Sequence, residues 1–259
     1  MRPAALCAAL AALVYLAAVN VPGLERADLQ VLTGFMGLPR TELAVDLAGL
    51  FDPAPFAVLA ASVALAGVAL GRAKEGVAAF ALMLGANVTT QILKPLLAVQ
   101  RDYPPFHVMG PEAWPSGHTT AVMSFALALL IVSPPRLRPL AAAFGGLLTV
   151  ATVYSILMLG WHYPSDIVGG LLIATAWACL VARGDARVSV SGPVAAGVLL
   201  AGAGAFAVFS RPEAALAYAA ANTTFVAGAL AIAGAALVLS GSVPVPRAAR
   251  RDRSHPARG

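Results

Sequence analysis

The sequence contains little charge and almost no cysteine. Only 11% of its 259 residues are Asp, Glu, Lys or Arg, which is about half the share found in soluble globular domains. Its two cysteines, Cys7 and Cys179, both fall inside apolar runs and are too few for a disulfide framework. The composition therefore argues against a soluble domain and a disulfide-stabilised scaffold, and we interpret both cysteines as small packing residues.

What the sequence does contain is long apolar runs. Hydrophobic residues make up 59% of the chain, and the mean hydropathy is +0.82. Eight runs, delimited by proline, glycine and charged residues, are each close to the ~20 residues that cross a bilayer as a helix. We therefore predict an all-α integral membrane protein with about eight transmembrane helices. These helices are expected near residues 3–22, 54–71, 76–98, 115–133, 139–159, 165–182, 193–210 and 221–240.

The distribution of basic residues predicts how these helices are oriented. If the N-terminus is cytoplasmic and the chain crosses eight times, 12 of the 17 Lys and Arg residues fall in inner segments. The positive-inside rule then predicts a multi-pass plasma membrane protein with both termini in the cytoplasm. An alternative is that residues 1–22 form a cleaved signal peptide, which would leave the orientation of the rest unchanged. The five outer cations are Arg26, Arg40, Lys94, Arg101 and Arg211.

Two segments outside the apolar runs have distinct compositions. Residues 23–53 combine spaced apolar residues with charges, which predicts one or two short amphipathic helices at the membrane interface. Residues 243–259 are rich in proline and arginine, so we expect a basic, disordered cytoplasmic tail that rests against anionic inner-leaflet lipids.

Pro115, Ser116, Gly117 and His118 are predicted to open the fourth long helix. Proline suits the first turn of a helix, and the first backbone N–H groups of a helix have no partner inside it. Together with the helix dipole, the N–H groups of Ser116 and Gly117 would form an anion site. The alternative is an ordinary helix cap in which His118 only fills space.

His162 and Asp166 are predicted to flank the start of the sixth long helix, which Pro164 would begin. A carboxylate that accepts from one imidazole nitrogen fixes the tautomer and leaves the other nitrogen as a nucleophile. It also stabilises the positive charge that develops on attack. A purely structural pair that caps the helix is the alternative.

Lys94 and Arg101 place two cations at the outer end of the third long helix. Charged residues at this depth are costly unless they have partners or a function; simple snorkelling to the headgroups is the alternative. Two cations beside two histidines would attract phosphate and repel a metal, so we reject a zinc site at His118, His162 and Asp166. His107 and His255 lack partners at a suitable spacing and are interpreted as non-catalytic.

These three motifs resemble those of the membrane-bound type 2 phosphatidic acid phosphatase superfamily, the lipid-phosphatase relatives of vanadium-dependent haloperoxidases. The family signature reads Lys-x6-Arg-Pro, Pro-Ser-Gly-His and Ser-Arg-x5-His-x3-Asp. The resemblance spans roughly residues 54–184 and implies a six-helix core that the first helix completes. It implies that His162 is the nucleophile, oriented by Asp166, and that His118 is the general acid. It further implies that Lys94, Arg101, Ser116 and Gly117 bind phosphate, with no metal or other cofactor.

The chain departs from this signature at two positions. Asp102 stands where the family has proline, and Ile156 stands where the family has an arginine that binds phosphate. One charge-assisted hydrogen bond typically contributes about 1.5–3 kcal/mol, so Ile156 would weaken phosphate binding. Arg40 and Arg211, both outer, are the candidates to substitute for it.

We expect metal-independent hydrolysis of a lipid phosphate or diphosphate, isoprenoid or glycerolipid, at the extracytoplasmic face. The alternatives are phosphotransfer to an acceptor other than water, a catalytically weak lipid-phosphate-binding protein, and a transporter, which is the least favoured. The expected partner is a membrane lipid, and neither a nucleic acid nor a metal. The expected organisation is a phosphatase core (1–184), two further transmembrane helices (185–242) and the basic tail (243–259).

Overall fold

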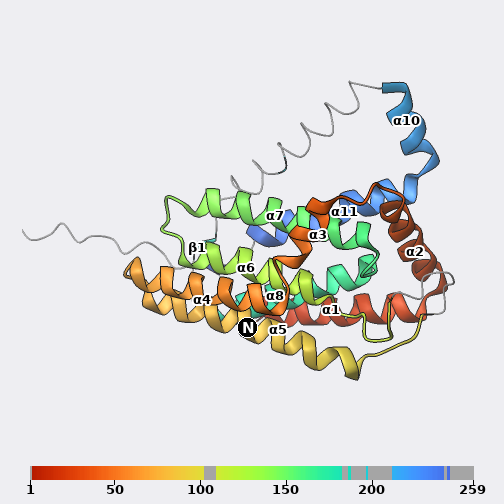
Figure 1. Ribbon diagram of the computed structural model, residues 1–259. Coiled ribbons are helices and arrows are strands. Elements are labelled where there is room, and N and C mark those ends of the chain that lie inside the picture. Colours follow the sequence, from red (N-terminus) through yellow and green to blue (C-terminus); the bar gives the residue numbers. More distant parts are fainter. Residues whose placement is uncertain are drawn as a thin grey trace, which may run out of the picture.

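The computed structural model describes residues 2–101, 109–182, 186–187, 197, 212–241 and 244–245. Within these ranges the chain forms a bundle of long helices that run roughly side by side, with one two-residue strand pair (Figure 1). The helices are α1 (Arg2–Asn20), α2 (Pro22–Met36), α3 (Glu42–Gly49), α4 (Pro53–Ala69), α5 (Ala73–Leu96), α6 (Gly117–Val132), α7 (Arg138–Leu159), α8 (Pro164–Val181), α10 (Pro212–Ala221) and α11 (Thr223–Gly241). The strands β1 (Ala186–Arg187) and β2 (Pro244–Val245) pair antiparallel.

Seven of the eight predicted long helices are present, as α1, α4, α5, α6, α7, α8 and α11. In the part of the chain that the structure describes, five helices (α1, α5, α7, α8 and α11) are long and apolar enough to cross a membrane. The pair α3 and α4, bent by 59°, would add a sixth span, and α6 is a shorter apolar helix. The all-α membrane fold is confirmed, whereas the number eight is not. Of the predicted helix at 193–210, only residue 197 is described.

Helix α6 lies at the centre of the bundle because its sequence is apolar on every side. Nearly every residue from Thr119 to Val132 is buried, as expected for a helix without a polar face. Helices α4, α5, α7 and α8 all contact it. The segment that carries His118 is thus held by helices on several sides.

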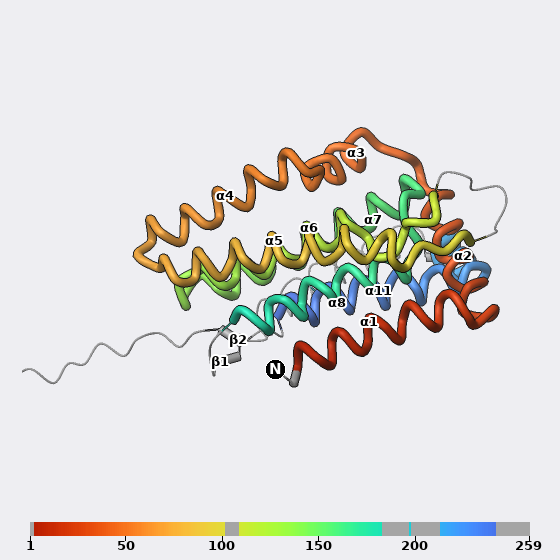
Figure 2. Tube along the Cα trace, turned by 90° about the horizontal axis from the view of Figure 1, so that it is seen from below, coloured from red at the N-terminus to blue at the C-terminus, as the bar shows by residue number. Residues whose placement is uncertain are grey.

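The segment 23–53 contains two short helices, α2 and α3, as predicted. Helix α2 lies across one end of the bundle, α3 and α4 follow as a bent pair, and the turn after α4 leads the chain back along α5 (Figure 2). The buried face of α2 consists of Asp28, Val31, Leu32 and Phe35. The start of α1 and the strand pair lie at the opposite end (Figure 2).

Two segments singled out from the sequence lie outside the described residues. They are 102–108, with Asp102 and His107, and the tail beyond residue 245, with His255. Cys7 and Cys179 are free; Cys7 is buried and Cys179 is half-buried. Their interpretation as packing residues is consistent with these positions.

Candidate active site

The turn between α7 and α8 places His162 next to the start of α8. Helix α7 ends at Leu159, and Gly160 follows with φ 74°, a left-handed conformation that glycine adopts readily. The Trp161 N–H then donates to the Ile156 carbonyl at 3.1 Å, which closes the end of the helix. The chain reverses within these residues, so His162 lies one turn before Asp166.

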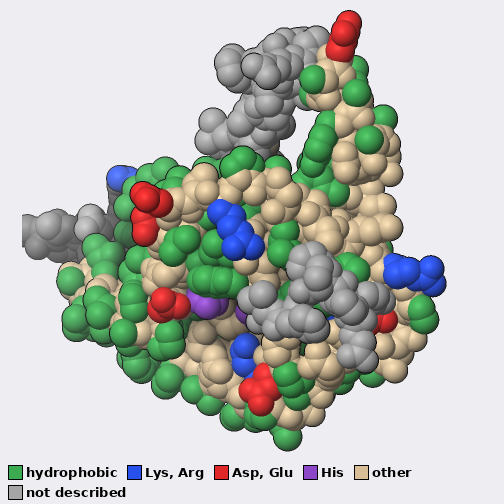
Figure 3. Space-filling model, turned by 45° about the vertical axis from the view of Figure 1, so that its right-hand side comes forward, with side chains coloured by type: hydrophobic (Ala, Val, Ile, Leu, Met, Phe, Trp, Pro, Cys, Tyr) green, Lys and Arg blue, Asp and Glu red, His purple; other side chains and the backbone are tan. Residues whose placement is uncertain are grey.

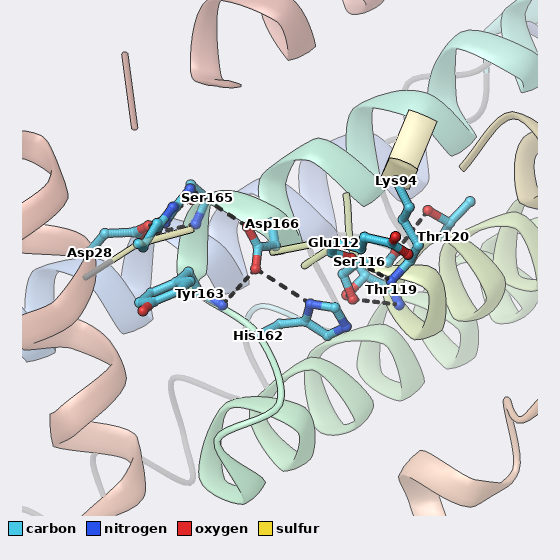
Figure 4. Close-up of polar contacts among 11 residues, drawn as sticks. Asp28, Lys94, Glu112, Ser116, Thr119, Thr120, His162, Tyr163, Ser165 and Asp166 are labelled. Carbon is cyan, nitrogen blue, oxygen red and sulfur yellow. Dashed lines mark hydrogen bonds and ion pairs between the residues drawn. The ribbon is translucent and has the colours of Figure 1, made fainter. Parts of the chain in front are cut away.

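His162 and Asp166 meet as their spacing predicts. The His162 Nδ1 lies 3.4 Å from Asp166 Oδ2, and the Tyr163 backbone N–H donates to the same oxygen at 2.9 Å. Both side chains are largely buried, at 9% and 1% exposure. The second ring nitrogen of His162 points toward Ser116 (Figure 4). This orientation suits a nucleophile whose tautomer is fixed by the carboxylate.

The start of α6 differs from the prediction in two details. The helix begins at Gly117 with Ser116 as its N-cap, so Pro115 precedes the helix instead of lying in its first turn. The Ser116 N–H donates to the Asp166 carbonyl at 3.0 Å and is therefore not free to bind an anion. A cap shifts the available donors one residue along the chain. Among the described residues, the N–H groups of Gly117 and His118 have no acceptor.

The Ser116 hydroxyl is fully buried and serves the helix cap. Its Oγ accepts from the Thr119 N–H at 3.3 Å and from Thr119 Oγ1 at 2.9 Å. Helix α8 approaches this cap closely because it carries glycine there. A Cβ atom added to Gly170 would lie 2.8 Å from the Ser116 carbonyl oxygen. The segment 115–118 and the helix that begins beside His162 and Asp166 therefore form one packed unit.

Lys94 completes one side of a cavity in front of His162. Its Nζ donates to the Glu112 carbonyl at 3.2 Å, and its Cε would lie 3.9 Å from a Cβ atom on Gly117. The cavity has a volume of about 400 Å³. Its lining includes Lys94, Trp161, His162 and the segment 109–113. A cation, a histidine and the α6 N-terminus thus lie around or next to a space large enough for a phosphate group.

Arg101 is held in a buried ion-pair network. Its Nη1 lies 2.7 Å from Asp28 Oδ2, and its Nη2 lies 3.1 Å from Ser165 Oγ and 3.8 Å from Asp166 Oδ1. The guanidinium also stacks over the Tyr163 ring, 4.5 Å from the centroid. Only 7% of the Arg101 side chain is exposed. Arg101 lies near Oδ1 of Asp166, whereas His162 lies near Oδ2. Its predicted role as a phosphate ligand stays a prediction.

Asp28 is a site residue that the sequence analysis missed. It accepts from the Ser165 N–H at 2.9 Å and from Ser165 Oγ at 2.6 Å, in addition to Arg101. Burial raises the pKa of Asp28, and the bonds from Ser165 and the charge of Arg101 offset this rise only in part. The carboxylate thereby connects α2 to the start of α8. Its position on the apolar stripe with Val31, Leu32 and Phe35 was the signal available in the sequence.

Asp52 is a second residue that was missed. Its Oδ1 lies 2.9 Å from His118 Nε2. The His118 ring also lies beside Trp161, with centroids 5.3 Å apart. Histidine side chains are partly visible on one face of the molecule, between acidic and basic side chains (Figure 3).

Ile156 is fully buried in the hydrophobic core, so no cation occupies the position of the family arginine. Arg40 is exposed and, in the part of the chain that the structure describes, has no ion-pair partner. Arg211 lies outside the described residues. The described residues also contain no group of three or more His, Cys, Asp or Glu side chains that could hold a metal.

Comparison with known proteins agrees with the motifs. Residues 75–188 match the PAP2 superfamily. A similar solved structure is the crystal structure of the first transmembrane PAP2-type phosphatidylglycerolphosphate phosphatase from Bacillus subtilis. It shares 18% sequence identity, covers 70% of this chain and 94% of its own, and superposes with a TM-score of 0.57. No curated protein sequence matches the chain. The family resemblance and the fold are thereby confirmed.

Proposed function

We propose, from the match of residues 75–188 to the PAP2 superfamily, that the chain hydrolyses a lipid phosphate or diphosphate through a phosphohistidine intermediate, without a metal. The observation that carries the proposal is the position of His162. One of its ring nitrogens lies 3.4 Å from the Asp166 carboxylate, and the other points toward the start of α6 (Figure 4).

In the first step, His162 Nε2 attacks phosphorus and the bond from phosphorus to the leaving oxygen breaks. Asp166 stabilises the imidazolium that forms. His118 donates a proton to the leaving oxygen, which departs as a lipid alcohol or a lipid phosphate. Lys94 and the N–H groups of Gly117 and His118 face the charge on the transferring phosphoryl oxygens.

In the second step, water attacks the phosphohistidine. His118, now neutral, accepts a proton from this water, and the bond between phosphorus and nitrogen breaks. Inorganic phosphate leaves, and both histidines return to their starting states. The charge of Arg101 lies 3.8 Å from Asp166 Oδ1 and stabilises the carboxylate. The family resemblance predicts that Arg101 also binds phosphate.

A lipid is the favoured substrate class because the site lies at the ends of membrane-spanning helices. A headgroup would reach His162 while the chains stay in the bilayer. The positive-inside distribution supports cytoplasmic termini and an extracytoplasmic site in the plasma membrane. We therefore favour isoprenoid or envelope-glycolipid phosphates over glycerolipids. We also propose the division into the core (1–184), two further spans (185–242) and a basic tail (243–259) that contacts anionic lipid.

The second candidate function is a catalytically weak lipid-phosphate-binding protein. It is favoured by Ile156, which supplies no charge where the family has arginine. Phosphotransfer to an acceptor other than water uses the same first step and differs only in the molecule that attacks the intermediate.

Phosphate release by the purified protein in detergent tests the proposal. The substrates are prenyl diphosphates, phosphatidic acid and phosphatidylglycerol phosphate, each with EDTA present. Release that resists EDTA and is abolished by His162→Ala is expected. Equal background from both proteins across the panel would contradict hydrolysis of these lipids and favour the binding protein. Product that forms only with an added acceptor would favour phosphotransfer.

A further inference from the structure

The carboxylate of Asp52 contacts a side chain of α6 instead of capping its own helix, α4. Asp52 is the N-cap of α4, a position whose side chain normally accepts from the backbone of the first turn, yet it makes no cap hydrogen bond. The sequence accounts for part of this, since Pro55 at the third helical position carries no N–H and only Ala54 is left as a usual capping donor. Asp52 Oδ1 instead lies 2.9 Å from Nε2 of His118.

The backbone before Asp52 is fixed to the helix that carries His118. Phe51 is only 3% exposed and packs edge-on against Phe125, with ring centroids 6.0 Å apart. Phe125 lies two helical turns after His118 on α6. The Asp52 N–H also donates to the Gly49 carbonyl at 3.1 Å, which closes the bend between α3 and α4. The carboxylate is therefore held beside the histidine by packing as well as by charge.

Burial of the ring opposes the protonated form of His118 most strongly, and the other charged groups that face it oppose that form too. Lys94 approaches from α5, and His162 approaches from the turn before α8. Among the described residues, Asp52 is the one carboxylate that acts on His118. A general acid must hold its proton until the leaving group departs. The Asp52 carboxylate stabilises the protonated ring of His118, whereas Lys94 and His162 do not.

We propose that Asp52 is a positioning residue for the general acid. Its carboxylate accepts from Nε2–H of His118, stabilises the imidazolium and leaves Nδ1–H to protonate the leaving oxygen. The site then contains two histidine–carboxylate pairs that use opposite ring nitrogens. In the His162–Asp166 pair, the carboxylate binds Nδ1 and Nε2 attacks phosphorus. This inference rests on the proposed hydrolase function.

The test compares Asp52→Asn with Asp46→Asn, which removes the same charge from an exposed position on neighbouring α3. Two substrates separate acid catalysis from general damage. A prenyl monophosphate needs a proton on its leaving oxygen, whereas 4-nitrophenyl phosphate does not. Asp52→Asn is expected to lower kcat/KM about 10-fold for the prenyl substrate and less than about two-fold for the aryl substrate. Asp46→Asn should match the unmodified protein on both.

The pH–rate profile distinguishes an effect of Asp52 on the protonation of His118 from a purely structural effect of the substitution. For the prenyl substrate, the high-pH limb is expected to shift to lower pH by about 0.5–1 unit in Asp52→Asn, a modest shift because the carboxylate is half-exposed. In a His118→Ala background, adding Asp52→Asn should change nothing further. Equal losses on both substrates with an unmoved limb would overturn the proposal, as would unchanged activity.

A titration of the His118 ring by NMR distinguishes failure of this proposal from failure of the hydrolase function. The titration midpoint is expected to fall by the same 0.5–1 unit in Asp52→Asn. No phosphate release from the unmodified protein, with a midpoint that still falls, would refute the hydrolase and support the pairing. A midpoint that does not move would refute the pairing, whatever the turnover.

Discussion

Replacing Asp28 with Asn is expected to weaken the connection between α2 and the active site. The carboxylate accepts from Arg101 at 2.7 Å and from the Ser165 backbone and hydroxyl at 2.9 and 2.6 Å. Asn keeps the size of the side chain and one oxygen for the Ser165 N–H. It removes the charge, so the guanidinium of Arg101, which is 7% exposed, loses its nearest counter-ion.

The expected cost follows from this geometry. Removing one partner of a buried ion pair typically costs about 3–5 kcal/mol. The Asp166 carboxylate, at 3.8 Å, compensates in part, so we expect about 2–3 kcal/mol. In a chain of this length each kcal/mol corresponds to about 2–4 °C, which gives a fall in Tm of roughly 4–12 °C.

The assay is thermal unfolding in detergent, followed by intrinsic fluorescence. Glu25→Gln is the matched control, because it removes a carboxylate from the same helix at a position whose side chain makes no hydrogen bond or ion pair among the described residues. Adding Arg101→Met to Asp28→Asn should recover most of the lost Tm, since the unpaired guanidinium is then gone. A Tm of Asp28→Asn equal to that of the control would refute the ion-pair network.

Three further outcomes are expected. Gly117→Ala should leave Tm unchanged, because the new Cβ lies 3.5 Å from Gln91 Nε2, but should lower kcat/KM at least about 10-fold by occupying space next to the anion donors; equal activity would contradict that site. Gly170→Ala should lower the free energy of unfolding by about 1–3 kcal/mol, because its Cβ would lie 2.8 Å from the Ser116 carbonyl, and unchanged denaturant unfolding would argue against this packing. EDTA should leave phosphate release unchanged, whereas loss restored by a divalent cation would contradict a metal-independent reaction.

The long helices and the His162–Asp166 pair could be predicted from the sequence because both depend on local properties. Apolar length alone predicts a membrane helix, and the start of α8 at Pro164 places Asp166 one turn after His162. The start of α6 was placed two residues too early because Pro115 was assigned to the first turn. A proline is compatible with several positions around a helix start, and tertiary contacts decide between them.

The contacts of the two missed carboxylates depend on distant parts of the chain. Asp28 lies 137 residues from Ser165 and 73 from Arg101, and its place on an apolar stripe was a visible sign of burial that did not identify a partner. Asp52 precedes a proline at a helix start, which is also the pattern of an ordinary cap. Its pairing with His118, 66 residues away, could be known only from the packing of α4 against α6 and of α3 against α7.

Covalent trapping tests the central claim most directly. The unmodified protein, His118→Ala and His162→Ala would each be mixed with an aryl phosphate, quenched within milliseconds under alkaline conditions and digested for mass spectrometry. The account predicts one phosphoryl group on His162 in the unmodified protein. It predicts more of this intermediate in His118→Ala, where water is no longer activated, and none in His162→Ala. Phosphate release without a phosphorylated His162 peptide, or a phosphoryl group on another residue, would contradict the account.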